Sequence, residues 1–104
     1  MRQIKLLKLE SGKTPFREWI SSLSGEIRIY IYDYMERVAS GGGKKNIRSL
    51  GGGVFEVKIN KGPGYRVYFA EQGKVILLIL LGGTKGSQKR DIKKAKEYWR
   101  LYNA

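Results

Sequence analysis

The stretch from Val54 to Asp91 decides the fold of this chain. It reads VFEVKINKGPGYRVYF over residues 54–69 and, after a short turn, VILLILLGGTKGSQKRD over residues 75–91. Apolar residues alternate along both arms of the first part, around a turn rich in glycine, which is the pattern of a β-hairpin. The second part begins with a continuous apolar run, which is typical of a strand inside a sheet.

The hairpin pattern predicts which side chains share a face of the sheet. If Ile59 pairs with Tyr65, then Lys58 lies opposite Arg66, and Glu56 lies opposite Tyr68 on the same face. The other face then carries the apolar set Phe55, Val57, Ile59, Tyr65, Val67 and Phe69. Because like charges directly opposite each other are unfavourable, we infer that the face with Lys58 and Arg66 binds an anion. An exposed face with solvated charges fits the spacing equally well.

Further elements are expected on both sides of this hairpin. Residues 4–9 predict a first strand, Thr14 and Pro15 start a helix, and Ser24 caps a second helix, for which a strand over residues 29–32 is the weaker alternative. Tyr30, Tyr32 and Tyr34 are expected to pack along one face of that helix rather than to stack on bases. A final helix is predicted from Gln88 to Tyr102, with Ile92, Ala95, Trp99 and Tyr102 facing inward.

These elements predict a single α+β domain over residues 1–104. Two N-terminal helices pack on a curved, mostly antiparallel sheet of about four strands (4–9, 54–60, 65–70 and 75–81), and a C-terminal helix completes the fold. Glycine triplets at 41–43 and 51–53 are expected to act as hinges between the helical half and the sheet half, with a basic loop between them.

Composition narrows the class of function. The chain has 104 residues, 21 Lys and Arg against 9 Asp and Glu, and a net charge of +12, so nucleic acid is the expected partner. It contains neither cysteine nor histidine, which excludes disulfides, zinc–thiolate sites and cysteine catalysis, and no metal or cofactor is expected. The longest apolar run, residues 75–81, is too short to cross a membrane. With no signal peptide expected, we predict a soluble, cytoplasmic protein.

The loop from Gly82 to Asp91 is a second candidate anion site. It follows the apolar strand and opens the final helix, where backbone amides attract anions. Lys85, Lys89 and Arg90 add positive charge, and Gln88 offers a hydrogen bond to a base or sugar. Basic residues oppose the helix dipole at this position, which favours function over an ordinary basic first turn. The loop matches neither a Walker A motif nor GxGxxG.

These motifs carry a resemblance to a known family. GPGYRVYF at 62–69 and the pattern GG-x-K-x-x-Q-x-x-DI at 82–92, together with Phe16, Trp19 and Ile20, resemble the phage-derived addiction-module killer proteins. Those proteins belong to the RelE/ParE toxin superfamily and are close to HigB-type toxins. The resemblance covers nearly the whole chain and implies the same order of elements.

The resemblance implies the toxin of a type II toxin–antitoxin pair. RelE-type members enter the ribosomal A site and cleave mRNA, whereas ParE-type members inhibit DNA gyrase. The partners implied are mRNA, the ribosome and an antitoxin, often of helix-turn-helix type. A ParE-like inhibitor without catalysis and a plain nucleic-acid-binding domain remain the alternatives.

The hypothesis for the site is a metal-independent endoribonuclease. Arg66 and Lys58 would stabilise the charge that develops on the phosphate, and Lys85 would support them. Glu56 and Asp91 are the candidate bases, with a lysine of lowered pKa as the competitor. The predicted nucleic-acid contacts are Tyr68, which would stack a base or donate a hydrogen bond, and Gln88, Lys89, Arg90 and Lys61.

Overall fold

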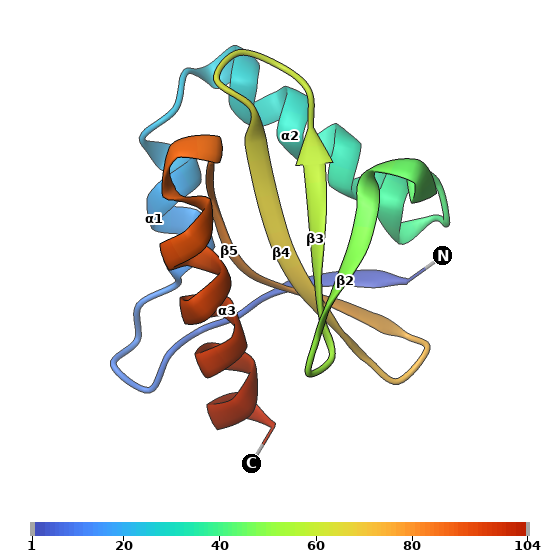
Figure 1. Ribbon diagram of the computed structural model, residues 1–104, viewed down its shortest axis with the longest axis vertical. Coiled ribbons are helices and arrows are strands. Elements are labelled where there is room, and N and C mark those ends of the chain that lie inside the picture. Colours follow the sequence, from blue (N-terminus) through green and yellow to red (C-terminus); the bar gives the residue numbers. More distant parts are fainter. Residues whose placement is uncertain (1, 104) are drawn as a thin grey trace.

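The computed structural model describes residues 2–103 and confirms the α+β class. Five strands form one sheet in the order β1-β5-β4-β3-β2, in which β1 runs parallel to β5 and the other neighbours are antiparallel (Figure 1). The strands are β1 (Gln3–Leu6), β2 (Ile47–Gly51), β3 (Val54–Ile59), β4 (Tyr65–Gln72) and β5 (Ile76–Thr84). The helices are α1 (Pro15–Ser21), α2 (Gly25–Ala39) and α3 (Gln88–Tyr102), with short 3-10 turns η1 (Lys44–Asn46) and η2 (Lys85–Ser87).

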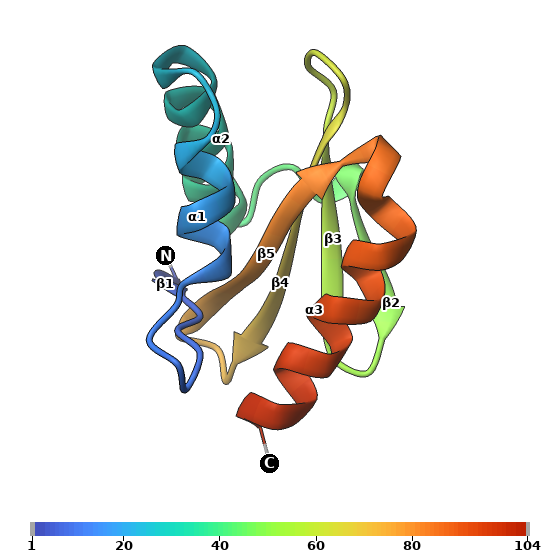
Figure 2. The same cartoon turned by 90° about the vertical axis from the view of Figure 1, so that its left-hand side faces the viewer.

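The helices cover both faces of the sheet. Figure 2 shows α1 and α2 on one face and α3 on the other. The first face buries the apolar hairpin set, including Val57 and Val67, against Phe16, Ile31 and Met35. The second face buries a smaller cluster under α3, which includes Tyr68, Leu80 and Ala95. The polar residues of the hairpin therefore lie on the face that α3 covers.

The register of the central hairpin is the predicted one. Ile59 pairs with Tyr65, Lys58 with Arg66, and Glu56 with Tyr68. The apolar strand β5 lies between β1 and β4, so it is internal to the sheet, as expected. Because side-chain direction alternates strictly along a strand, this pairing sets the face of every hairpin residue.

The segment between the two glycine triplets differs from the prediction. It was expected to be a loop, but it contains η1 and the edge strand β2, so the sheet has five strands rather than about four. Only Ile47 and Leu50 are apolar in β2, and a bulge interrupts its pairing between Ser49 and Gly51, so the local pattern is weak. The triplet 51–53, with positive φ throughout, turns the chain between β2 and β3. It is a hairpin turn, not a hinge.

The helix starts agree with the sequence, while some helix faces do not. Thr14 and Ser24 are the N-cap residues, and residues 29–32 lie inside α2, which rules out the alternative strand. Of the α2 tyrosines only Tyr34 is buried, whereas Tyr30 and Tyr32 are 39% and 37% exposed. Tyr32 still packs edge-on against the Phe16 ring, with ring centroids 5.9 Å apart. The expected packing is therefore wrong only for Tyr30.

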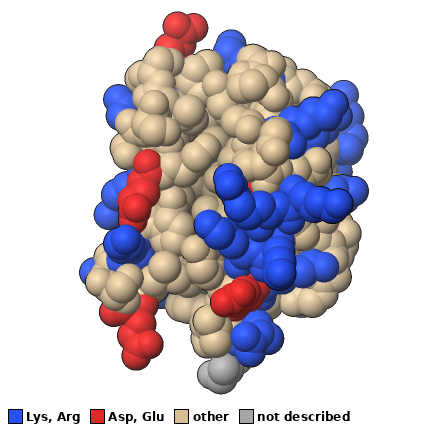
Figure 3. Space-filling model, turned by 60° about the vertical axis from the view of Figure 1, so that its left-hand side comes forward, with Lys and Arg blue, Asp and Glu red and all other residues tan. Residues whose placement is uncertain are grey.

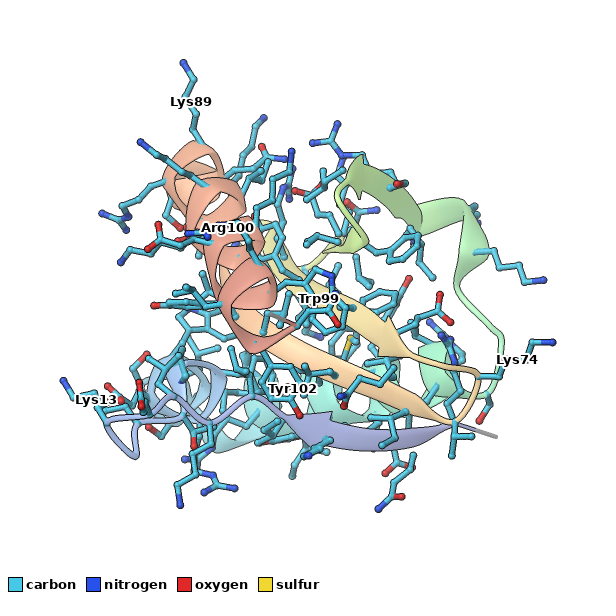
Figure 4. The ribbon with its side chains drawn as sticks, turned by 90° about the horizontal axis from the view of Figure 1, so that it is seen from below. Lys13, Lys74, Lys89, Trp99, Arg100 and Tyr102 are labelled. Atoms are coloured by element: carbon cyan, nitrogen blue, oxygen red, sulfur yellow. The ribbon has the colours of Figure 1, made fainter. Side chains whose placement is uncertain are left out.

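The end of α3 is also more exposed than the sequence predicted. Ala95 is buried and Ile92 and Trp99 are partly buried, but Tyr102 is 37% exposed. Its ring stacks on Trp99, and its hydroxyl bonds with Lys5 Nζ and Gln72 Nε2 at 3.3 Å each, so it lies at the edge of the core. Figure 4 shows Trp99 and Tyr102 on the side of α3 toward the sheet, and Lys89 pointing away. Within residues 2–103, no helix is long and apolar enough to cross a membrane.

Candidate functional site

A cavity of about 490 Å³ brings four of the predicted site residues together. It lies where β2, β3 and β4 meet the start of α3. Glu56, Lys58, Arg66 and Gln88 line it, and so do Lys45, Asn46, Ile47, Arg48 and Asn60. The lining contains several cations and one carboxylate, so an anion is the ligand that its charge favours.

The carboxylate of Glu56 organises this cavity. Arg48 Nε donates to Glu56 Oε1 at 2.8 Å, and Gln88 Nε2 donates to Oε2 at 2.8 Å. Glu56 is 3% exposed, and Arg48 reaches it because the two residues pair across β2 and β3. Gln88 is the first residue of α3. Glu56 therefore ties the edge of the sheet to the start of α3, and a buried charge of this kind is stabilised by such charge-assisted bonds.

Arg66 is the least satisfied polar group in the site. It is 5% exposed, and its Nε and Nη1 are buried without a hydrogen-bond partner among the described residues. Glu56 Oε2 lies 3.9 Å from Arg66 Nε, which is close enough for ion pairing but too long for a hydrogen bond. A buried guanidinium with free donors is costly unless an anion completes it. Arg66 also lines the cavity, so an anion bound there would offset this cost.

The facing cations predicted from the register are both present, but their environments differ. Arg66 is buried beside Glu56, whereas Lys58 is exposed and its side chain lines the cavity. The nearby Glu56 carboxylate offsets part of the repulsion between them. The charges on this face are therefore neither all exposed to solvent nor all paired with one another.

Gly64 brings the β5–α3 connection next to Arg66. A Cβ at Gly64 would lie 3.6 Å from Arg66 Nη1 and 3.7 Å from Lys85 Cβ, and Lys85 N donates to Gly64 O at 2.9 Å. The backbone at Lys85 thus lies beside Arg66. The side chain of Lys85 is exposed and does not line the cavity. Lys85 can support the site only from its rim.

Tyr68 is placed below the site rather than in it. Its side chain is fully buried under α3, so no face of the ring is free to stack a base, contrary to that expectation. Burial raises the pKa of Tyr68 well above its usual range, and the charges of Glu56 and Asp91 raise it further. The tyrosine therefore stays neutral and belongs to the apolar cluster under α3.

Two adjacent glycines let the helices approach β5 from opposite faces. A Cβ on Gly82 would collide with the ring of Trp19 from α1, and a Cβ on Gly83 would collide with the carboxylate of Asp91 from α3. Asp91 is buried and accepts a hydrogen bond from Ser87 Oγ. It does not line the cavity. The pair GG therefore serves close packing, and Asp91 holds the first turn of α3 in place.

The predicted anion-binding loop is mostly regular structure. Strand β5 continues to Thr84, and η2 follows, closed by reciprocal bonds between Thr84 and Ser87. Of this segment only Gln88 reaches the cavity, while Lys89 and Arg90 are exposed outside it. Lys61 does not line the cavity either, and its Nζ lies 4.4 Å from the centre of the Tyr30 ring. The hairpin face and the Gly82–Asp91 segment therefore meet at the cavity through Gln88 rather than through the lysines.

Exposed cations of α3 form a separate basic surface. On the face of the molecule seen in Figure 3, Lys and Arg side chains gather over α3. The exposed members are Lys89, Arg90, Lys93, Lys94, Lys96 and Arg100. Such a surface favours approach of a polyanion but carries no defined geometry for chemistry.

Sequence reasoning missed the β2 side of the cavity. Lys45, Asn46 and Arg48 were read as part of a basic loop, and their contribution depends on the pairing of β2 with β3. The available signal was the pair Ile47 and Leu50 before a triple-glycine turn. Within residues 2–103, no group of three carboxylates, histidines or cysteines is placed to hold a metal ion.

Comparison with known proteins identifies relatives of this chain. The model of a family described as phage-derived protein Gp49-like (DUF891) matches residues 18–100. An uncharacterized protein of Haemophilus influenzae (strain ATCC 51907 / DSM 11121 / KW20 / Rd) is 38% identical over 82 residues, which cover 78% of this chain and 82% of the relative. The matched range includes the whole cavity lining.

Proposed function

The chain belongs to the phage-derived Gp49-like family, a family of RelE-like addiction-module toxins, and from that premise we propose that it is an mRNA endoribonuclease that acts on the ribosome. Within the superfamily we place it with the HigB-like toxins of type II toxin–antitoxin systems. The family implies an antitoxin as partner.

One observation carries the proposal. Arg66 is buried at the cavity with Nε and Nη1 unpartnered, and Lys58 faces it across the hairpin. A phosphodiester fits this pair because a planar guanidinium can bind two phosphate oxygens while an ammonium acts as a point charge. Both groups are fixed to paired β-strands, so they are positioned before the substrate arrives.

The proposed reaction is transesterification within the RNA strand. The 2′-oxygen forms a bond to the adjacent phosphorus, and the bond from phosphorus to the 5′-oxygen of the next nucleotide breaks. A base accepts the proton of the 2′-hydroxyl, and an acid returns a proton to the departing 5′-oxygen. Arg66 stabilises the additional negative charge on the phosphate oxygens.

Glu56 is the better placed of the two candidate bases. It lines the cavity within 3.9 Å of Arg66 Nε, whereas Asp91 is bonded to Ser87 and lies outside the lining. Binding of RNA would have to displace Gln88 or Arg48 from one carboxylate oxygen, and Gln88 would then be free to contact the substrate. Lys58, an exposed ammonium at the same cavity, is the candidate acid.

The antitoxin is proposed to be a small helix-turn-helix protein with an acidic segment. Acidic side chains complement the net charge of +12 and the exposed cations of α3. Covering this surface would remove the positive charge that favours the approach of RNA.

Adding the purified protein to translating ribosomes tests the proposal. We expect mRNA breaks at defined positions relative to codons, and we expect none with Arg66→Ala, whose fold is checked by circular dichroism. Breaks made equally well by Arg66→Ala would refute the assignment of the site. Inhibition of DNA supercoiling without RNA breaks would favour a ParE-like gyrase inhibitor, and salt-sensitive binding without either effect would indicate a plain nucleic-acid-binding domain.

A further inference from the structure

A second hollow adjoins the cavity that contains Arg66. It measures about 630 Å³ and lies between α2 and the tip of the β3–β4 hairpin. Lys45, Asn46 and Asn60 line both hollows, so the two share a wall. The second is lined further by Tyr30, Tyr34, Arg37, Gly43 and Lys44. Side by side, the two hollows extend from Arg66 to α2.

Aromatic rings and cations are interleaved along this second hollow. Lys61 Nζ lies 4.4 Å from the centre of the Tyr30 ring, and the Arg37 guanidinium lies 4.5 Å from the centre of the Tyr34 ring. Asn46 Nδ2 donates to the Tyr34 hydroxyl at 2.7 Å, which fixes that ring. Among the described residues that line this hollow there is no carboxylate, although Asp33 lies beside it.

The ring of Tyr30 is exposed and has no role in the hydrophobic core of this domain. The ring is 39% exposed on a helix whose other face supplies the core. An exposed ring beside an ammonium and a planar guanidinium is a combination that binds stacked bases and their phosphates in single-stranded nucleic acid. An acidic protein segment would pair with the cations of this lining but would leave the exposed ring of Tyr30 unused, whereas a nucleic-acid strand engages both.

We propose that this second hollow, defined by Tyr30, Arg37 and Lys44, is a subsite for nucleotides flanking the cleaved phosphate. The inference rests on the proposed function, because it takes the strand bound at Arg66 to be RNA. One base stacks on Tyr30, and Arg37 and Lys44 contact the phosphates that follow. Affinity then depends on substrate length, since a short strand fills only the cavity at Arg66.

Binding of two lengths of 2′-O-methyl RNA tests the subsite, because the methyl group blocks attack by the 2′-oxygen. The wild-type protein should bind a mixed-sequence octanucleotide more tightly than a trinucleotide in fluorescence anisotropy. Tyr30→Ala should weaken binding of the octanucleotide by at least about fivefold, the lower end for loss of one stacked base. Its affinity for the trinucleotide should equal that of the wild type.

Tyr32→Ala is the matched control. Tyr32 lies on the same helix with nearly the same exposure, 37%, but it contacts the Phe16 ring edge-on and lines neither hollow. Its affinity for both oligonucleotides should match the wild type, and circular dichroism verifies the fold of both variants.

The remaining outcomes separate the inference from the proposed function. If Tyr30→Ala binds both lengths like the wild type, or weakens both equally, the subsite is refuted, while a loss of binding in Arg66→Ala still supports the cavity. If the wild-type protein binds neither RNA, or Arg66→Ala binds both normally, the proposed function fails and the subsite fails with it.

Discussion

Glu56 Oε2 lies 3.9 Å from Arg66 Nε, at a separation where the two charges attract each other but form no hydrogen bond. Glu56 instead accepts hydrogen bonds from Arg48 and Gln88, at 2.8 Å each. Arg66 is thereby held beside a carboxylate while its own donors stay free. We propose that this relationship makes the site receptive to a phosphate, and the first two predictions test that proposal.

Glu56→Gln should separate cleavage from binding. The amide keeps the shape of the side chain but cannot accept the proton of a 2′-hydroxyl, so single-turnover cleavage should fall by about 10²- to 10⁴-fold. Affinity for 2′-O-methyl RNA should be unchanged or higher, because the cavity loses its negative charge.

Glu71→Gln is the control for this change, since Glu71 pairs with Arg2 and lies outside the cavity lining. Its cleavage rate should equal that of the wild type. A normal cleavage rate for Glu56→Gln would exclude Glu56 as the base.

Lys58→Met should reduce the salt dependence of RNA binding. If the ammonium contacts one phosphate, its removal should lower the slope of log K against log salt concentration by about 0.7 for a single strand. A titration of 2′-O-methyl RNA at several salt concentrations measures the slope.

Lys74→Met removes the same charge elsewhere. Lys74 lies in the turn between β4 and β5, at the opposite end of the sheet from the turn between β3 and β4 (Figure 1). This variant should keep the slope of the wild type. Equal slopes for both variants would mean that Lys58 contributes only to the general field of the protein.

Tyr68 should lower the stability of the fold as the pH rises above 10. Its pKa is raised by burial, so in the folded protein it stays protonated where an unfolded tyrosine ionises, above pH 10. The unfolded state then binds fewer protons, and the free energy of unfolding decreases as pH rises, by up to about 1.4 kcal/mol per pH unit from this group. Below pH 10 both states keep the proton and the contribution is constant.

This pH dependence is checked by measuring the free energy of unfolding in urea for the wild type and for Tyr68→Phe, below and above pH 10. The difference in unfolding free energy between the two proteins should change in favour of the phenylalanine variant as pH rises. A difference that is independent of pH would show that Tyr68 ionises as readily in the folded state as in the unfolded chain.

Gly83→Ala should destabilise the fold. The added methyl group would collide with the Asp91 carboxylate and lie 2.8 Å from Ser87 Oγ, so α3 would have to move away from β5. A loss of about 1–3 kcal/mol in the free energy of unfolding is expected for such overpacking. Gly86→Ala is the matched variant, because its nearest neighbour is Thr84 Oγ1 at 3.7 Å. If both variants unfold at the same urea concentration, the close approach of α3 to β5 is not required.

Local periodicity made much of the fold predictable. The two arms of the hairpin carry alternating side chains around a short turn, so the pairing of Lys58 with Arg66 follows from parity. Helix starts at Thr14 and Ser24 were readable because capping preferences depend on neighbouring residues. Strand β2 was not readable, since its identity depends on pairing with β3 rather than on its own weak pattern.

By itself, then, the sequence determined the hairpin, its register, the buried strand β5 and the strong positive charge, because each depends on residues close together in the chain or on composition. Only the tertiary structure decided that Tyr68 is buried, that Asp91 packs against Gly83, and that Gln88 reaches Glu56 from 32 positions away. The docking of α3 on the sheet decides all three. That docking also leaves the donors of Arg66 buried and free, a property that no alternation of side chains along a strand can specify.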